Sequence, residues 1–112
     1  MTKASAVAEI IATYQKYGWI LRRVLLTSQS SKNLQHDKDS LFGETIIVDS
    51  AIDAAWFSRP PKSGGVAWEI RYLGDIPFAL LENVDEDDEQ FENLLSSVEL
   101  RLCESISAKI SA

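Results

Sequence analysis

The chain contains one cysteine and one histidine in 112 residues. A lone Cys103 cannot form an intrachain disulfide, which fits a reducing compartment and favours a cytoplasmic protein; a secreted protein with few cysteines is the alternative. Cys103 and His36 are far apart in the sequence and no motif links them, so we expect Cys103 to be a small buried hydrophobic side chain. A single histidine beside the loop carboxylates Asp37 and Asp39 is usually solvated, so no metal site is predicted.

The motifs of common enzyme classes are also missing. The chain has no GxSxG, HExxH or CxxC sequence, and Gly64-Gly65 lacks the following Lys-Ser/Thr of a phosphate-binding loop. The carboxylates form a surface run rather than standing singly at strand ends, where a shifted pKa would indicate acid–base chemistry. The sequence therefore favours a non-catalytic protein, and no cofactor is predicted.

No apolar run is long enough to cross a membrane, and Glu9 interrupts the N-terminal candidate for a signal peptide. The formal net charge is −6. One segment without lysine or arginine carries much of it, through Glu82, Asp85, Glu86, Asp87, Asp88, Glu89 and Glu92. Such a segment repels phosphate backbones, so neither nucleic acid nor membrane is predicted as a partner. It is interpreted as a solvated helix start or as a docking surface for a basic protein.

The residues that are present indicate one α+β domain over residues 1–112, with average hydrophobic and charged content. Apolar spacing predicts an N-terminal helix that ends at Gly18. Further strands are predicted at 19–26, 44–48 and 55–59. The first of them is apolar on both faces, which suits a central strand covered on both sides, except for Arg22 and Arg23, which alternation places on opposite faces. The polar segment 28–42 is predicted to be a mobile loop, because it offers little to bury.

Residues 66–82 predict a β-hairpin closed by a Gly-Asp turn at 74–75. The glycine permits the positive φ that a type II′ turn requires at its first central position. With a two-residue turn, Ala79 and Leu81 share the face of Trp68. A three-residue loop is the alternative, and it would exchange the two faces of the second strand.

A long C-terminal helix is predicted after Asp85, its expected cap. Helical spacing places on its core-facing side Phe91, Leu94, Leu95, Val98, Leu102 and Ile106. Leu100 and Cys103 lie off this stripe. We therefore expect the helix to contact something on a second side, either another part of the fold or a second subunit.

The simplest arrangement is an antiparallel sheet of about five strands, flanked by the N-terminal helix and the long C-terminal helix on one face. The acidic charge, the α+β order and the long final helix resemble those of bacterial type III secretion chaperones. This resemblance is one of architecture and assigns no residue.

Trp56, Arg59, Trp68 and Arg71 are the candidate ligand-binding residues. Arginine beside tryptophan can hold a carboxylate or phosphate while a flat group stacks on the indole. Cross-strand aromatic and arginine pairs also stabilise ordinary sheets, by about 0.2–1 kcal/mol each. Packing alone is therefore the favoured interpretation of these residues, and ligand binding is the alternative.

Two functions are expected from these observations. The first is a non-catalytic, chaperone- or adaptor-like protein-interaction domain that forms a homodimer and receives another protein on its sheet or C-terminal helix. The second is a small-ligand binding domain that holds an anionic or aromatic compound with Trp56, Arg59 and Arg71. Catalysis is the third possibility.

Overall fold

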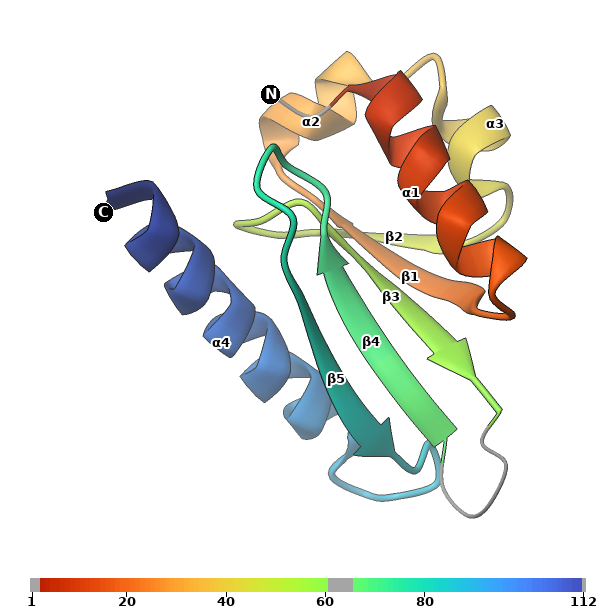
Figure 1. Cartoon of the computed structure of the whole chain (residues 1–112), viewed down its shortest axis with the longest axis vertical. Coiled ribbons are helices and arrows are strands. Elements are labelled where there is room, and N and C mark those ends of the chain that lie inside the picture. The colour runs from red at the N-terminus through yellow and green to blue at the C-terminus, as the bar shows by residue number, and fades with distance from the viewer. Residues whose placement is uncertain (1–2, 61–65, 112) are drawn as a thin grey trace.

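The computed structural model describes residues 3–60 and 66–111, which form a five-stranded sheet with helices on both faces (Figure 1). The helices are α1 (Ala4–Lys16), α2 (Ser28–Asn33), α3 (Lys38–Phe42) and α4 (Phe91–Ser111). The strands are β1 (Ile20–Leu26), β2 (Ile46–Asp49), β3 (Ala54–Arg59), β4 (Val66–Tyr72) and β5 (Ala79–Val84). The α+β class, the five-stranded sheet and the two terminal helices are confirmed.

The sheet is mixed rather than purely antiparallel, and its strand order is β2-β1-β3-β4-β5. β1 and β2 are parallel, whereas every other neighbouring pair is antiparallel. The parallel pair arises because the chain returns over the sheet through α2 and α3 before it enters β2. The expectation of an antiparallel arrangement throughout is therefore wrong for this one pair.

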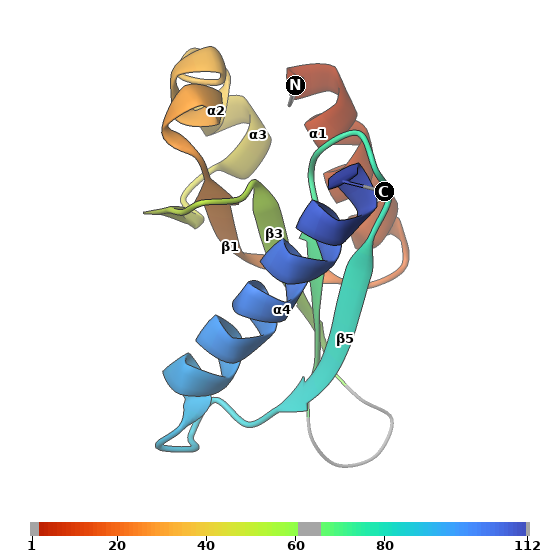
Figure 2. The same cartoon turned by 90° about the vertical axis from the view of Figure 1, so that its left-hand side faces the viewer.

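The two terminal helices lie on opposite faces of the sheet, not on one face as the sequence predicted (Figure 2). We call these the α4 face and the α1 face. The α4 face has a core that includes Trp56, Trp68, Ile70, Leu95, Val98 and Leu102. The core of the α1 face includes Val7, Ile11, Val24, Leu26, Leu34, Phe42 and Phe57. Each face therefore has its own buried cluster, with the sheet between them.

α1 ends at Lys16, and Gly18, two residues on, stops the helix as predicted. Gly18 has a φ of 87°, in the left-handed region that glycine tolerates best. The N–H of Gly18 donates to the carbonyl of Gln15 at 3.1 Å, and the N–H of Trp19 donates to that of Tyr14 at 3.0 Å. This is a Schellman motif, and the rings of Tyr14 and Trp19 supply its usual apolar contact.

Arg22 and Arg23 share one face of the sheet, contrary to the strict alternation that the sequence suggested. The register between β1 and β3 shifts between Leu21 and Arg23, so Arg22 is an extra residue in β1. The guanidinium of Arg22 lies 4.8 Å from the ring centre of Trp68, and Arg23 binds Glu92 of α4. The bulge thus directs both cations toward the α4 face.

β4 and β5 form the predicted hairpin, but its register differs by one residue from that of a two-residue turn. Ile70 lies opposite Leu80, and residues 73–78 connect the two strands. Leu80 therefore packs on the α4 face, while Leu81 points to the other face and is 59% exposed. The faces are exchanged as the alternative loop predicted, and the placement of Ala79 and Leu81 beside Trp68 is wrong.

Gly74 does not have the positive φ of a type II′ turn; among the described glycines only Gly18 and Gly43 do. Its role is steric instead. A Cβ atom at position 74 would collide with the ring of Tyr72, which folds back over the loop.

The segment 28–42, predicted to be an irregular loop, forms the short helices α2 and α3. The hydroxyl of Thr27 caps α2 by accepting the N–H of Ser30 at 3.2 Å. Leu34 and Phe42 are buried and fix the segment to the α1 face. The greater mobility expected for 28–42 stays a prediction.

α4 begins at Phe91, so the predicted cap at Asp85 is wrong. The acidic residues before it form turns instead: the carboxylate of Asp85 accepts the N–H of Asp87, and that of Asp88 accepts the N–H of Gln90. The stripe Leu95, Val98, Leu102 and Ile106 is buried as expected. Leu94 is not part of it, with 36% of its surface exposed.

Candidate functional site

The four predicted ligand-binding residues are divided between the two faces of the sheet. Trp56 and Trp68 are buried on the α4 face, whereas Arg59 and Arg71 alternate to the α1 face. The indole N–H of Trp56 donates to Glu99 of α4 at 2.8 Å. The indole N–H of Trp68 has no hydrogen-bond partner among the described residues. Both indoles thus serve as packing for α4, and the four residues do not form one pocket.

The arginines of the α1 face border two neighbouring hollows beside α1. The guanidinium of Arg59 stacks over Trp19, 4.7 Å from its ring centre. One hollow has a volume of about 330 Å³ and is lined by Thr13, Tyr14, Tyr17, Trp19, Arg59 and Glu69. The other has about 240 Å³ and is lined by Glu9, Ile10, Thr13, Tyr14 and Arg71. A ligand here would meet cationic and anionic side chains in both hollows.

Tyr14 separates the two hollows and is held firmly. Its ring stacks on Phe57 with centroids 4.1 Å apart, and its hydroxyl donates to Glu69. Burial, followed by the bond to Glu69, raises the pKa of Tyr14, so it stays a neutral hydrogen-bond donor. Tyr14 and Trp19 were not among the predicted site residues. The signal that could have found them is their position on either side of Gly18, where a helix reverses into a strand.

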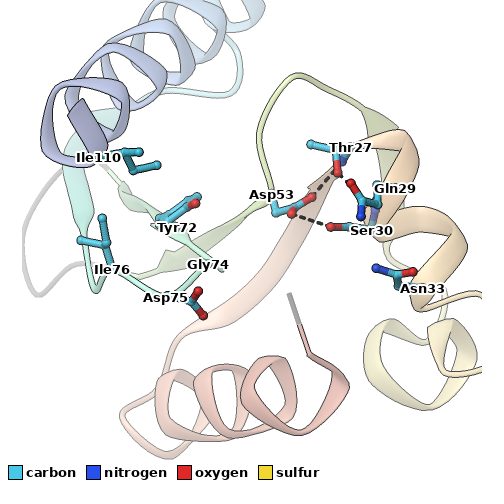
Figure 3. A pocket seen from close by; sticks show the side chains of 10 residues that line it. All are labelled: Thr27, Gln29, Ser30, Asn33, Asp53, Tyr72, Gly74, Asp75, Ile76 and Ile110. Atoms are coloured by element: carbon cyan, nitrogen blue, oxygen red, sulfur yellow. Dashed lines mark hydrogen bonds between the residues drawn. The ribbon is translucent and has the colours of Figure 1, made fainter. Parts of the chain in front are cut away.

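A larger cavity of about 450 Å³ opens where α2, the loop after β4 and the end of α4 meet (Figure 3). Its lining comprises Thr27, Gln29, Ser30, Asn33, Asp53, Tyr72, Gly74, Asp75, Ile76 and Ile110. Figure 3 shows Ile76 and Ile110 on one side and the polar side chains of α2 on the other. These residues come from separate parts of the chain, so no local sequence pattern indicated the cavity.

The carboxylate of Asp53 has a structural task in this cavity. It accepts the N–H of Thr27 at 2.8 Å and the hydroxyl of Ser30 at 2.5 Å, which fastens the start of α2 to β3. Burial, and then the charges of Asp53 and Asp75, raise the pKa of Tyr72. Asp53 and Asp75 both line the cavity, and none of the residues that the sequence predicted to bind a ligand does so.

The acidic segment before α4 is partly neutralised by arginines from other elements. Arg22 binds Glu86 at 2.9 Å, Arg23 binds Glu92 at 3.0 Å, and Arg101 binds Glu82. Of the segment's carboxylates, Glu92 lies in the first turn of α4. The interpretation as a solvated helix start thus holds for Glu92 alone, since Glu82 lies in β5 and the other carboxylates lie in the connection between β5 and α4.

The strand β2 presents an uncovered apolar edge. It is the outermost strand beside β1, and no described strand pairs with its other side. Ile46 is 64% exposed and Val48 is 39% exposed, and both side chains alternate away from Ile47, which packs on the α1 face. α4 lies toward the β5 side of the sheet (Figure 2). Ile46 and Val48 remain exposed to solvent.

Within residues 3–60 and 66–111, no three His, Cys, Asp or Glu side chains are placed to hold a metal ion. None of the described helices combines the length and the apolar character that a bilayer crossing requires. Comparison with protein families, with characterised proteins and with solved structures finds no match for this chain. The geometry of the described residues is therefore the basis for assigning a function.

Proposed function

We propose that this chain is a non-catalytic protein-interaction domain of the cytoplasm that acts as a homodimer. The observation that carries the proposal is the edge strand β2, whose apolar residues Ile46 and Val48 remain in solvent. Protein-interaction domains commonly receive an extended segment on such an edge. Backbone hydrogen bonds then supply affinity, and the exposed side chains supply specificity.

An unprotected edge strand is unusual in a protein that acts alone. Natural sheets protect their edges with very short strands, charged side chains, proline, bulges or a covering element, because an open edge pairs with other chains. The sequence of β2, Ile-Ile-Val-Asp, contains neither lysine nor proline, and its protection is limited to its short length and to Asp49. On the opposite edge, Glu82 of β5 is bonded to Arg101 of α4. β2 is therefore the edge better suited to pairing.

Sedimentation velocity across a range of concentrations tests this proposal. The wild-type chain is expected to show a reversible dimer, and Val48→Lys is expected to be monomeric, because it places a charge in the paired edge. Leu81→Lys is the control, since Leu81 is also an exposed aliphatic side chain, on the other edge strand. A wild-type chain that stays monomeric at the highest concentration would contradict the proposal.

A second candidate is small-ligand binding at the hollows beside α1, which Arg59 and Arg71 border. An aromatic compound with one anionic group could stack beside Trp19 and meet Arg59. A thermal-shift screen of aromatic carboxylates and nucleotides tests this, since saturation at a hundredfold excess over Kd adds about 2.7 kcal/mol of stability. Arg59→Ala should abolish the shift, and Arg101→Ala on α4 should not. If no compound shifts the wild type, this candidate is wrong.

A further inference from the structure

We infer that the occupant of the β2 edge is β2 of a second copy, antiparallel to the first and paired about a two-fold axis at Ile47. This inference rests on the proposed homodimer and specifies its register. Three properties of β2 carry it: the direction of its backbone groups, the identity of its side chains, and the position of its single charge.

The backbone of β2 determines which residues can pair outward. The N–H of Ser50 donates to the carbonyl of Leu26 at 3.0 Å, so Ser50 points its backbone groups to β1. These groups alternate along a strand, so those of Ile46 and Val48 also point to β1. Those of Ile47 and Asp49 consequently point to the open side, where a second strand would bind.

An antiparallel register centred on Ile47 uses both outward groups of Ile47 and the outward N–H of Asp49. Ile47 would exchange two hydrogen bonds with Ile47 of the second copy. The N–H of Asp49 would donate to the carbonyl of Thr45 in the second copy, and the reverse bond completes four. The N–H of Thr45 is already bonded to the carbonyl of Phe42 at 3.0 Å, so in this register the carbonyl of Asp49 is left to solvent.

The side chains match in the same register. Ile46 lies opposite Val48 of the second copy, and the two-fold axis repeats this pair, so the exposed aliphatic side chains on the α4 face form two contacts. Ile47 meets its own copy on the α1 face. Asp49 lies opposite Thr45, so no like charges are placed together.

Other two-fold registers lose one of these properties. A centre at Ile46 or Val48 would make that residue a non-hydrogen-bonded pair and would leave its bonds to β1 intact, so the backbone permits both centres. The side chains disfavour them: a centre at Val48 would place Ile46 opposite Ser50 and Ile47 opposite Asp49, and a centre at Ile46 would place Val48 opposite Glu44. A centre at Asp49 would place two aspartates directly opposite each other, which is destabilising. The register centred on Ile47 is thus singled out, and it joins two sheets with both α4 helices on the same face.

Engineered cysteines test the register. In a Cys103→Ser background, one chain carries Ile46→Cys and a second carries Val48→Cys. Opposite residues of a non-hydrogen-bonded pair have Cα atoms about 4.5 Å apart, within disulfide range. Like positions of the two copies are diagonal neighbours at about 7–8 Å, beyond that range. After exchange in a glutathione buffer, the mixture should form a disulfide-linked dimer, and each variant alone should not.

Charge variants at position 45 give an independent measurement by sedimentation equilibrium. Thr45→Glu would face Asp49 of the second copy and should raise the dimer Kd at least about fivefold, whereas Thr45→Lys should lower it. Adding Asp49→Lys to Thr45→Glu should restore the wild-type Kd.

The outcomes separate the two proposals. A wild-type dimer whose variants cross-link singly, or do not cross-link when mixed, overturns the register and leaves the homodimer standing. A dimer indifferent to the charge at position 45 likewise overturns the register. A chain that is monomeric throughout overturns both the register and the proposed function.

Discussion

Leu94 and Leu95 are neighbours in the sequence with opposite environments. Leu95 is 1% exposed under the sheet, and Leu94 lies at the margin of α4 with 36% exposed. We expect Leu95→Ala to lower the free energy of unfolding by about 2–5 kcal/mol, because it leaves a cavity in the core of the α4 face. Urea denaturation measures the change.

Leu94→Ala is the matched control and should cost clearly less, since it removes little buried surface. Equal losses for the two variants would show that α4 is rotated about its axis. The sequence indicated Leu95 correctly, because its spacing from Val98 and Leu102 follows the helical repeat. It misplaced Leu94, because the width of a buried stripe depends on the surface that it meets.

The candidate site residues show the same limit of sequence reasoning. Arginine and tryptophan three residues apart in a strand face opposite ways, so Trp56 and Arg59 could not share a pocket unless the strand were bulged. The partner of Arg59 is Trp19, which approaches from the end of α1. No local pattern connects these two residues.

At the scale of elements, α4 is fastened to β1 by the pair Arg23 and Glu92. The hydrogen bond from Arg23 lowers the pKa of Glu92 in the folded protein. Its stabilising contribution is therefore present above the ordinary carboxyl pKa of about 4.3, and it is lost as the pH falls through the lowered value. Since 68% of the Glu92 side chain is exposed, solvent screening keeps this contribution small.

Glu92→Gln should accordingly lower the free energy of unfolding at pH 7 by at most about 1 kcal/mol, and the difference should vanish in acid. Guanidinium would screen the pair, so urea titrations from pH 7 to pH 2 are the suitable measurement. Glu89→Gln, in the turns before α4, is the control for a change of net charge alone. A loss for Glu92→Gln that persists unchanged in acid would rule out this ion pair as its cause.

The elements themselves were predictable where their patterns were local. The helix stop at Gly18 and the strands β1, β2 and β3 follow from glycine and from apolar runs. The bulge at Arg22 and the hairpin register could not be predicted, because each depends on how the residues of one strand pair with those of its neighbour. The helices α2 and α3 were missed because their polar sequence conceals two anchors, Leu34 and Phe42.

At the scale of the whole molecule, the opposite placement of α1 and α4 had one signal in the sequence. Residues 19–26 are apolar on both faces, as expected of a strand covered twice. The arrangement of both helices on one face contradicted this signal. The parallel pairing of β1 and β2 had no signal in the sequence, because the polar segment between them does not indicate in which direction the chain enters β2.

The late position of α4 in the chain has a consequence for biosynthesis. All five strands are synthesised before α4, and until α4 has been made Trp56 and Trp68 have no helix to cover them. The nascent chain therefore exposes a hydrophobic surface that chaperones can recognise. The docking of α4 on this surface should change the fluorescence emission of Trp56 and Trp68, because α4 brings Glu99 to Trp56 and Phe91 to Trp68.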